Sequence, residues 1–124
     1  MIKAAITGTG LFTPSESISN DELVLSFNTY VQNYNLSHAA EIESGEINAL
    51  QESSSAFIEK ASGIKSRYVM NKSGILDPEI MHPLLPERSN DEPSILCEMA
   101  VSAAKEALKN ANKTVADIDA VIVA

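Results

Sequence analysis

The chain has 124 residues, of which 44% are hydrophobic, and it carries a formal net charge of -8. This length suits one domain, the apolar fraction excludes wholesale disorder, and the acidic balance argues against a nucleic-acid or anionic-membrane surface. A single cysteine, Cys97, excludes an internal disulfide framework and a cysteine zinc cluster. No apolar run approaches the roughly 20 residues that span a bilayer, and the N-terminus lacks the apolar centre of a secretory signal. We therefore expect a cytoplasmic protein.

Residues 2–8 are predicted to form the first strand, because they are mostly apolar and lead into Gly-Thr-Gly. That turn does not match the dinucleotide fingerprint, which requires a further glycine opening a helix, so nucleotide binding is not favoured. Ser19 and Glu22 have capping-box spacing and predict a helix start. Apolar residues then recur at three- and four-residue steps and predict a face for the core or for a subunit contact. They are Leu23, Phe27, Tyr30, Val31 and Tyr34.

Residues 36–52 contain four glutamates and neither lysine nor arginine. Their apolar residues are too sparse to predict a helix firmly, although a helical hairpin is possible. Together with His38, the glutamates could be taken for a metal cluster, but their spacing does not place them on one helical face. A solvated surface is therefore favoured.

A second helix is predicted over residues 56–62, because the serines at 53–55 suit an N-cap and Gly63 suits a left-handed C-terminal position. Residues 64–70 alternate and predict a strand exposed on one side. Residues 71–92 are predicted to form a long irregular loop with apolar anchors at Met81, Leu84 and Leu85. Loops of this length are usually functional or contact another subunit.

The last helix is predicted to begin at Asp91 or Glu92, because Pro93 suits a first turn, and to end near Asn112, a suitable C-terminal cap. Its alanines are small and permit close approach to a sheet or another helix. The predicted buried stripe consists of Leu96, Met99 or Ala100, Ala103, Ala107 and Leu108.

Thr114 and Asp117 again have capping-box spacing and predict a single helical turn. Residues 120–124 are apolar and partly β-branched, which predicts a strand buried on both faces, as in a parallel sheet. Such a strand needs neighbours, and it suggests a fragment of a larger protein.

No catalytic constellation is visible in the sequence. Cys97 is the only candidate nucleophile. It is predicted to lie in the middle of a helix among apolar residues and beside Glu98, which favours a structural role. His38 and His82 lie in irregular segments, where surface histidines are commoner than general bases. We expect no metal site and no cofactor.

Three segments together resemble the N-terminal part of β-ketoacyl-acyl carrier protein synthase III. They are residues 2–10 with Thr13 and Pro14, residues 57–67 with their Ser-Gly-Ile-x-x-Arg turn, and residues 99–108 followed by Asp-Ile-Asp-x-Val-Ile-Val-Ala. Their order and spacing fit the family, apart from an insertion near residues 30–52. The resemblance covers nearly the whole chain but well under half of a complete family member.

The resemblance implies an α/β class with a thiolase-like mixed sheet and helices, in which residues 1–124 form part of the first half-domain. The loop at 71–92 would supply dimer surface. It also implies a decarboxylative Claisen condensation in fatty acid or related acyl biosynthesis, between an acyl thioester and malonyl-acyl carrier protein. The implied partners are acyl carrier protein, an acyl thioester linked to coenzyme A or to a carrier protein, and a second subunit in a homodimer.

The family catalyses this reaction with Cys, His and Asn, all of which fall beyond residue 124. Cys97 does not match the family nucleophile, so we expect the 124 residues alone to be inactive. A non-enzymatic α/β interaction or dimerisation module is the alternative interpretation of the chain.

The same resemblance indicates a substrate-binding site at the mouth of the acyl tunnel. There the family has a Thr, a Trp and, four residues after the Trp, an Arg that hold coenzyme A. These positions correspond to Ser53, Phe57 and Ala61. Phe57 could stack on adenine or be a simple core residue, whereas Ala61 cannot pair with a phosphate. The hypothesis that follows is a carrier-delivered or unusual acyl donor.

Overall fold

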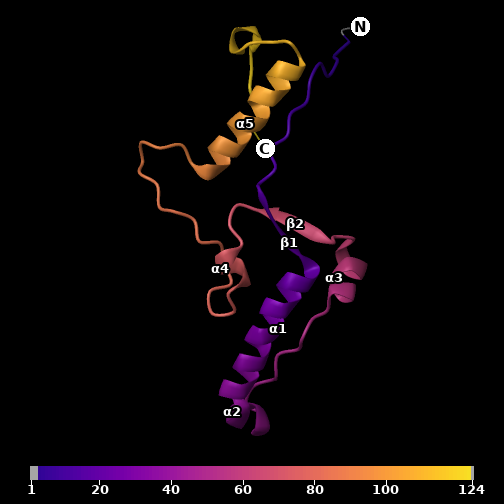
Figure 1. Ribbon diagram of the computed structural model, residues 1–124, viewed down its shortest axis with the longest axis vertical. Coiled ribbons are helices and arrows are strands. Elements are labelled where there is room, and N and C mark those ends of the chain that lie inside the picture. The colour runs from indigo at the N-terminus through magenta and orange to yellow at the C-terminus, as the bar shows by residue number, and fades with distance from the viewer. Residues whose placement is uncertain (1–2, 124) are drawn as a thin grey trace. The chain divides into compact units, whose positions relative to one another are not determined.

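The computed structural model describes residues 3–123, which belong to two compact units (Figure 1). One unit comprises residues 14–86, and the other comprises the residues up to 13 together with those from 87 onward. Helices and a small sheet are both present, which is compatible with the predicted α/β class. The elements are β1 (Glu16–Ser19), α1 (Asn20–Ser37), α2 (Ala39–Glu43), α3 (Ser55–Ser62), β2 (Ser66–Val69), α4 (Ser73–Leu76), α5 (Ile95–Asn110) and the 3₁₀ turn η1 (Val115–Asp117).

The sheet of residues 14–86 is an antiparallel pair formed by β1 and β2. Ile18 lies opposite Arg67, and the strands close with Ser19 opposite Ser66. The prediction of a strand within residues 64–70 is confirmed, and side chains of β2 alternate between exposed and half-buried. β1 was not predicted, because four residues with two serines and a glutamate carry little apolar pattern.

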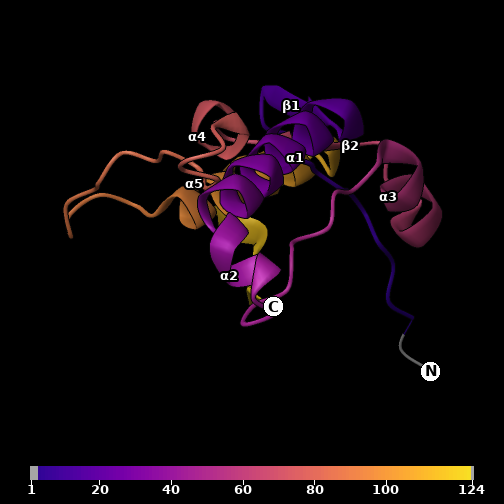
Figure 2. The ribbon, with the colours of Figure 1, turned by 90° about the horizontal axis from the view of Figure 1, so that it is seen from below.

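Helix α1 is the centre of this unit. It lies between α3 and α4 and contacts both (Figures 1 and 2). Val31 of α1 and Ile18 of β1 are the fully buried side chains among residues 3–123, with exposed fractions of 1% and 0%. The remaining residues of the predicted apolar stripe on α1 are half-buried. The stripe therefore faces the unit, but only one of its members is completely covered.

Helix α3 begins and ends as the sequence predicts. Ser54 is its N-cap, and the Phe57 N–H donates to the Ser54 hydroxyl over 3.1 Å. Gly63 ends the helix with a φ of 72°, the left-handed conformation that favours glycine.

The loop at 71–92 folds back on itself around Gly74, which is buried in the short helix α4. A Cβ atom at Gly74 would lie 2.4 Å from the His82 carbonyl oxygen and 2.6 Å from Leu84 Cγ. Leu84 thus packs on α4, and this contact requires a glycine. The three predicted anchors are nevertheless exposed, Met81 at 38%, Leu84 at 48% and Leu85 at 44%.

The second unit contains α5, whose predicted start is wrong by about three residues. The helix begins at Ile95 because Ser94 is the N-cap and accepts from the Cys97 N–H over 3.2 Å. Arg88 contacts both carboxylate oxygens of Glu98, at 2.8 and 2.9 Å, which ties the preceding loop to the first turn. At the other end, Asn112 adopts a φ of 53°, so its predicted role in ending the helix is confirmed.

Residues 3–13 do not form the predicted strand. They run without regular structure along α5, where Gly8 and Gly10 meet the helix backbone. A Cβ atom at Gly10 would lie 2.0 Å from the Ala103 carbonyl oxygen, and one at Gly8 would lie 2.5 Å from that of Ala107. The alanines do permit close approach, but the partner is an extended segment and not the predicted sheet or helix. A strand needs backbone partners, and the described residues offer none here.

Residues 120–123 are likewise exposed and irregular, so the predicted terminal strand is absent from the described part of the chain. Residue 2 of the first predicted strand and residue 124 of the second lie outside the described residues. η1 does form before this segment, and Thr114 and Asp117 make the predicted capping box.

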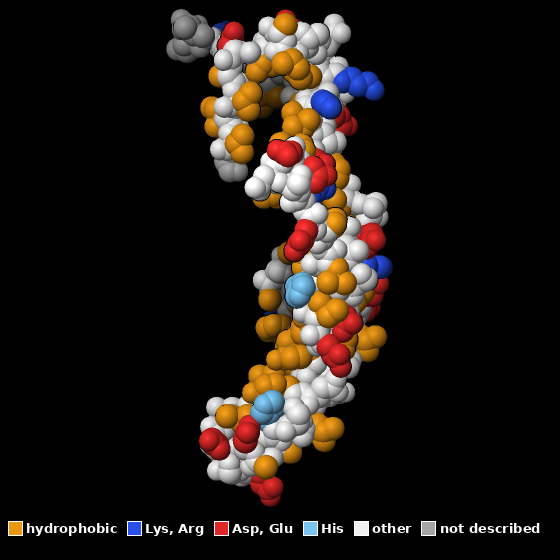
Figure 3. Space-filling view, turned by 90° about the vertical axis from the view of Figure 1, so that its left-hand side faces the viewer, with side chains coloured by type: hydrophobic (Ala, Val, Ile, Leu, Met, Phe, Trp, Pro, Cys, Tyr) orange, Lys and Arg blue, Asp and Glu red, His pale blue; other side chains and the backbone are white. Residues whose placement is uncertain are grey.

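Large apolar side chains are exposed on both units, as the orange surface in Figure 3 shows. On α5, no residue is fully buried, and Leu96 of its predicted buried stripe is 77% exposed. The stripe is half-buried instead at Met99, Ala103 and the last turn, where residues 3–13 cover it. No helix within residues 3–123 is both long and apolar enough to cross a membrane.

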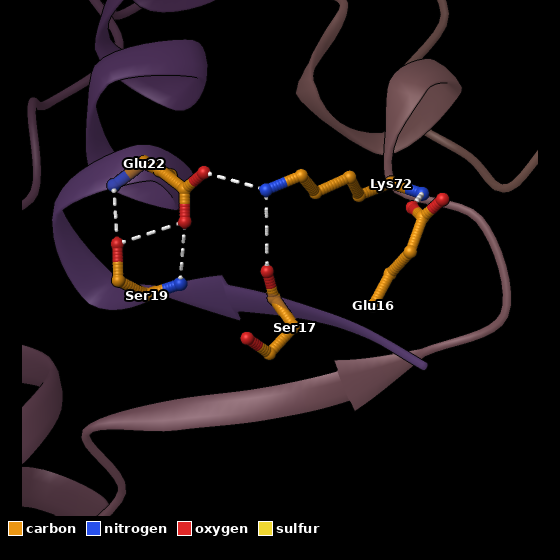
Figure 4. Close-up of polar contacts among 5 residues, drawn as sticks. All are labelled: Glu16, Ser17, Ser19, Glu22 and Lys72. Carbon is orange, nitrogen blue, oxygen red and sulfur yellow. Dashed lines mark hydrogen bonds and ion pairs between the residues drawn. The ribbon is translucent and has the colours of Figure 1, made fainter. Parts of the chain in front are cut away.

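A polar network joins the start of α1 to the segment after β2 (Figure 4). Glu22 accepts from the Ser19 N–H at 2.9 Å and from the Lys72 ammonium group at 3.0 Å. The Lys72 N–H donates to Glu16 over 2.8 Å. The Ser19 N–H, followed by Lys72 and the Ser19 hydroxyl, lowers the pKa of Glu22 to about 2. The predicted capping box is therefore present and extends into an ion pair.

Candidate functional site

The segment that leads into α3 is held against α1 by side-chain amides. Asn28 donates from Nδ2 to the Ser53 carbonyl oxygen over 3.0 Å and accepts from the Ser53 N–H over 2.9 Å. Asn35 makes the same pair of bonds with Leu50, both at 2.9 Å. Between them, Gln32 donates to the Glu52 carboxylate over 2.7 Å. A side-chain amide has one donor and one acceptor side, so each asparagine pairs with a backbone as a neighbouring strand would.

These three amides were missed at the sequence level. Asn28, Gln32 and Asn35 are spaced by four and three residues, which places them on one face of a helix. That spacing is a usable signal for a helix that binds an extended segment. The apolar stripe of α1 instead predicted a buried face, which does not include these amides.

Two of the three predicted site residues line a common open cavity of about 530 Å³. These are Ser53, which is half-buried, and Phe57, which is 66% exposed. The cavity is completed by Phe27, Gln51, Glu52 and Ser54. Most of the Phe57 ring faces solvent within residues 3–123, which does not favour the alternative that Phe57 is a core residue. Ala61 is exposed on α3, one turn after Phe57, and does not line this cavity.

A second, smaller cavity of about 230 Å³ shares Phe27 and Ser53 with the first. Its other lining residues are apolar, namely Leu23, Val24, Ile58 and Met81. Phe27 and Ser53 therefore separate a partly polar opening from an apolar one. Such a pairing of an apolar wall with a few polar groups is typical of a small-molecule site.

Charge at the larger cavity is confined to Glu52, and no lysine or arginine lines either cavity within residues 3–123. This lining does not favour an anionic group. It suits a ligand segment with neutral hydrogen-bonding groups and apolar carbons.

The remaining candidate residues do not assemble a catalytic group. His38 lies within 2.9 Å of the Tyr34 carbonyl oxygen and stacks on the Tyr34 ring, with 4.2 Å between the ring centroids. His82 Nδ1 lies 3.2 Å from the Pro83 carbonyl oxygen. Both histidines thus serve local structure. Residues 3–123 contain no cluster of three or more His, Cys, Asp or Glu side chains suited to a metal ion.

Cys97 differs from its prediction. Its side chain is exposed, and the residue lies in the first turn of α5 instead of the middle of a helix. The difference follows from the later start of α5. Its thiol has no histidine or lysine hydrogen-bonded to it among the described residues, so no activated nucleophile is formed here.

A third cavity, of about 440 Å³, lies in the unit that contains α5. It is almost wholly apolar and is lined by Thr7, Gly8, Ala104, Ala107, Leu108, Ala111, Lys113, Val115, Ile118, Ala120 and Val121. None of the predicted site residues lies in it.

Comparison with known proteins finds a similar sequence in a curated enzyme. No family profile matches the chain. The chain is similar to a β-ketodecanoyl-[acyl-carrier-protein] synthase of Pseudomonas aeruginosa, with 72% identity over 99 residues. The match covers 80% of this chain and 28% of that enzyme. The resemblance to β-ketoacyl-acyl carrier protein synthases is therefore confirmed, and the chain spans less than a third of the curated relative that it matches.

Proposed function

We propose that this chain is the N-terminal portion of a β-ketoacyl-acyl carrier protein synthase of the synthase III type. The observation that carries the proposal is the 72% identity over 99 residues to the β-ketodecanoyl-[acyl-carrier-protein] synthase. The enzyme would catalyse a decarboxylative Claisen condensation in fatty acid or related acyl biosynthesis. An enzymic cysteine takes the acyl group from a thioester, malonyl-acyl carrier protein loses CO₂, and the resulting carbanion attacks the acyl carbonyl and releases the cysteine thiolate.

The relative's name also suggests the chain length of the substrate. Condensation with malonyl-acyl carrier protein adds two carbons after CO₂ is lost, so a β-ketodecanoyl product requires an eight-carbon acyl donor. We propose an octanoyl thioester as donor for the enzyme that carries this chain, with malonyl-acyl carrier protein as the second substrate.

The proposal includes the thiolase-like fold, the insertion near residues 30–52, the dimer surface on the loop at 71–92 and a cytoplasmic homodimer. Helix α2, the extended residues up to 52 and the asparagine contacts of α1 all fall in or beside the insertion. The exposed apolar side chains of α5 and residues 120–123 support a sheet and helices supplied by further chain or by a second subunit. A stand-alone interaction module is less well supported, because it would not account for the high identity to an enzyme.

Ser53, Phe57 and Ala61 are proposed as the substrate entrance. The Phe57 ring supports a stacking role, because it lines the cavity of Phe27 and leaves most of its surface open to a planar group. The absence of a cationic side chain at Ala61 supports a donor whose phosphates are not held at this position. A carrier-delivered acyl group meets that condition better than coenzyme A does.

The test uses the full-length enzyme with octanoyl-coenzyme A or octanoyl-acyl carrier protein as donor and malonyl-acyl carrier protein as acceptor. Formation of β-ketodecanoyl-acyl carrier protein is followed by mass spectrometry. We expect product from the carrier-linked donor and a higher KM for the coenzyme A donor. No product from either donor would contradict the proposed function.

Substitutions at α3 test the entrance. Phe57→Ala should raise the donor KM, while Tyr68→Ala, which removes a ring of similar exposure from β2, should leave it unchanged. Ala61→Arg should lower the KM for the coenzyme A donor alone, because it adds a phosphate partner. Equal effects of Phe57→Ala and Tyr68→Ala would remove Phe57 from the site.

A further inference from the structure

The three serines before α3 use their hydroxyl groups differently. The Ser54 hydroxyl accepts from the Phe57 N–H and so caps α3. The Ser55 hydroxyl donates to the Asp21 carboxylate of α1. The Ser53 hydroxyl makes no hydrogen bond within residues 3–123, although Ser53 lines both the cavity of Phe27 and Phe57 and the smaller apolar cavity that shares Phe27. One hydroxyl of the three is therefore available to a ligand.

The backbone of Ser53, in contrast, is fully engaged. Its N–H and its carbonyl oxygen both pair with the Asn28 side chain, at 2.9 and 3.0 Å. Two bonds to one planar amide hold the residue in a single orientation. Because Asn28 comes from the rigid helix α1, the position of the Ser53 hydroxyl is set by α1 and not by the loop alone.

Asn35 provides an internal comparison. Its side-chain amide makes the same two bonds to the Leu50 backbone, both at 2.9 Å, and we call each such pair of bonds a clamp. Leu50, however, lines neither cavity. Loss of either clamp removes the same interactions from the structure. Only loss of the Asn28 clamp frees a residue that faces the cavities.

We infer that Asn28 is a positioning residue that holds Ser53 to hydrogen-bond the phosphopantetheine arm of the acyl donor at the cavity of Phe27 and Phe57. The inference rests on the proposed function. The arm carries two amides and a hydroxyl along an otherwise apolar chain. This chemistry matches a cavity with an apolar wall, free side-chain oxygens and no cation among the described residues. Coenzyme A and acyl carrier protein share this arm.

The experiment compares Asn28→Ala, Asn28→Asp and Asn35→Ala in the full-length enzyme, with octanoyl-coenzyme A and octanoyl-acyl carrier protein as separate donors. The two alanine variants should lose similar stability in chemical denaturation. Asn28→Ala alone should raise the donor KM, by roughly tenfold, which corresponds to about 1.4 kcal/mol of binding, with little change in kcat. Asn28→Asp keeps the acceptor for the Ser53 N–H and should have an intermediate effect.

The two donors identify the part of the ligand that is held. A KM increase for both donors is expected, because both contain the arm. An increase for octanoyl-coenzyme A alone would overturn the inference and place the nucleotide at this cavity. Equal KM increases in Asn28→Ala and Asn35→Ala would also overturn it, since the clamps would then serve stability only.

Failure of the proposed function is recognised separately, as absence of product from the wild-type enzyme with either donor. In that case, equilibrium binding of 4′-phosphopantetheine to the same proteins still decides the inference. Weaker binding by Asn28→Ala than by Asn35→Ala supports it, and equal binding contradicts it.

Discussion

Residues 14–86 and the unit built around α5 are stabilised by different kinds of contact. In residues 14–86, side chains of α1 bond to loop backbones, as Asn28 and Asn35 do, and Ile18 and Val31 form a very small core. Around α5, glycine and alanine let two backbones meet with almost no side chain between them. A loop held by specific hydrogen bonds can present a residue such as Ser53 in a defined position. Close backbone packing instead orders a segment without presenting polar groups.

The largest effect should come from the small core. Ile18→Ala removes most of a completely buried side chain and should lower the free energy of unfolding of residues 14–86 by about 3 kcal/mol. Leu25→Ala on α1 is the control, since Leu25 is 72% exposed and should change stability by less than about 0.5 kcal/mol. Urea denaturation followed by circular dichroism measures both. Similar losses would show that the core does not stabilise this unit.

The packing around α5 should be nearly as sensitive. Gly10→Ala places a Cβ atom against backbone of α5, which cannot move aside as a flexible side chain can, and should cost about 2 kcal/mol. Amide hydrogen exchange at Leu11 gives a local measurement, because its N–H donates to Glu106 over 2.7 Å. Exchange should accelerate in Gly10→Ala and stay unchanged in Thr9→Ala. Unchanged exchange in both would contradict the close packing.

The capping box should contribute less. Ser19→Ala removes the hydroxyl that accepts from the Glu22 N–H and should destabilise α1 by about 1 kcal/mol. Ser17→Ala is a matched control on the same strand, because only the Ser17 backbone contacts Lys72. The difference in denaturation midpoint between the two variants measures the contribution of the Ser19 cap to stability. Equal midpoints would refute the role of Ser19.

The same network predicts a dependence on pH. The folded-state pKa of Glu22 is lowered from 4.5 to about 2, so its contribution is present above the unfolded value and is lost as pH falls from about 4.5 to about 2. Glu22→Gln should be less stable than wild type at pH 7, and the difference should close over that window. Glu43→Gln, which removes an exposed carboxylate, should show no such convergence. A difference that persists at pH 2 would contradict the ionic network.

The smallest effect is expected at Cys97. Its exposed thiol has no activating partner among the described residues, so Cys97→Ser should leave the condensation rate of the full-length enzyme within about twofold. A loss of acyl transfer in this variant would show that the proposed nucleophile had been placed wrongly.

Local signals were the best guide to this structure. Ser19 with Glu22, Gly63, Asn112 and Thr114 with Asp117 each act over a few residues, and all occur in their predicted roles. The start of α5 was misplaced because Pro93 suits a first turn, but the neighbouring Ser94 provides the cap. Element ends depend on such single hydrogen bonds, which are difficult to rank from sequence.

The site was predicted only in part. Resemblance singled out Ser53 and Phe57, and the structure places both at one cavity, while Ala61 lies outside it. Phe27 was predicted only as part of an apolar stripe. Asn28 was not singled out. Its spacing with Gln32 and Asn35 marks a polar face of α1, but that spacing does not identify a backbone partner 25 positions away.

The sequence by itself determined α1, α3 and most of α5, since their periodicity and caps depend on side chains near one another along the chain. It also carried the resemblance to β-ketoacyl-acyl carrier protein synthases, whereas α4 was not predicted. Tertiary structure decided that the apolar segments at residues 3–8 and 120–123 do not form strands. A strand exists only when its backbone groups find partners, and the described residues provide none for either segment. Tertiary structure also decided that α1 clamps Ser53, because only folding brings an asparagine side chain within 3.0 Å of a backbone that lies 25 residues away.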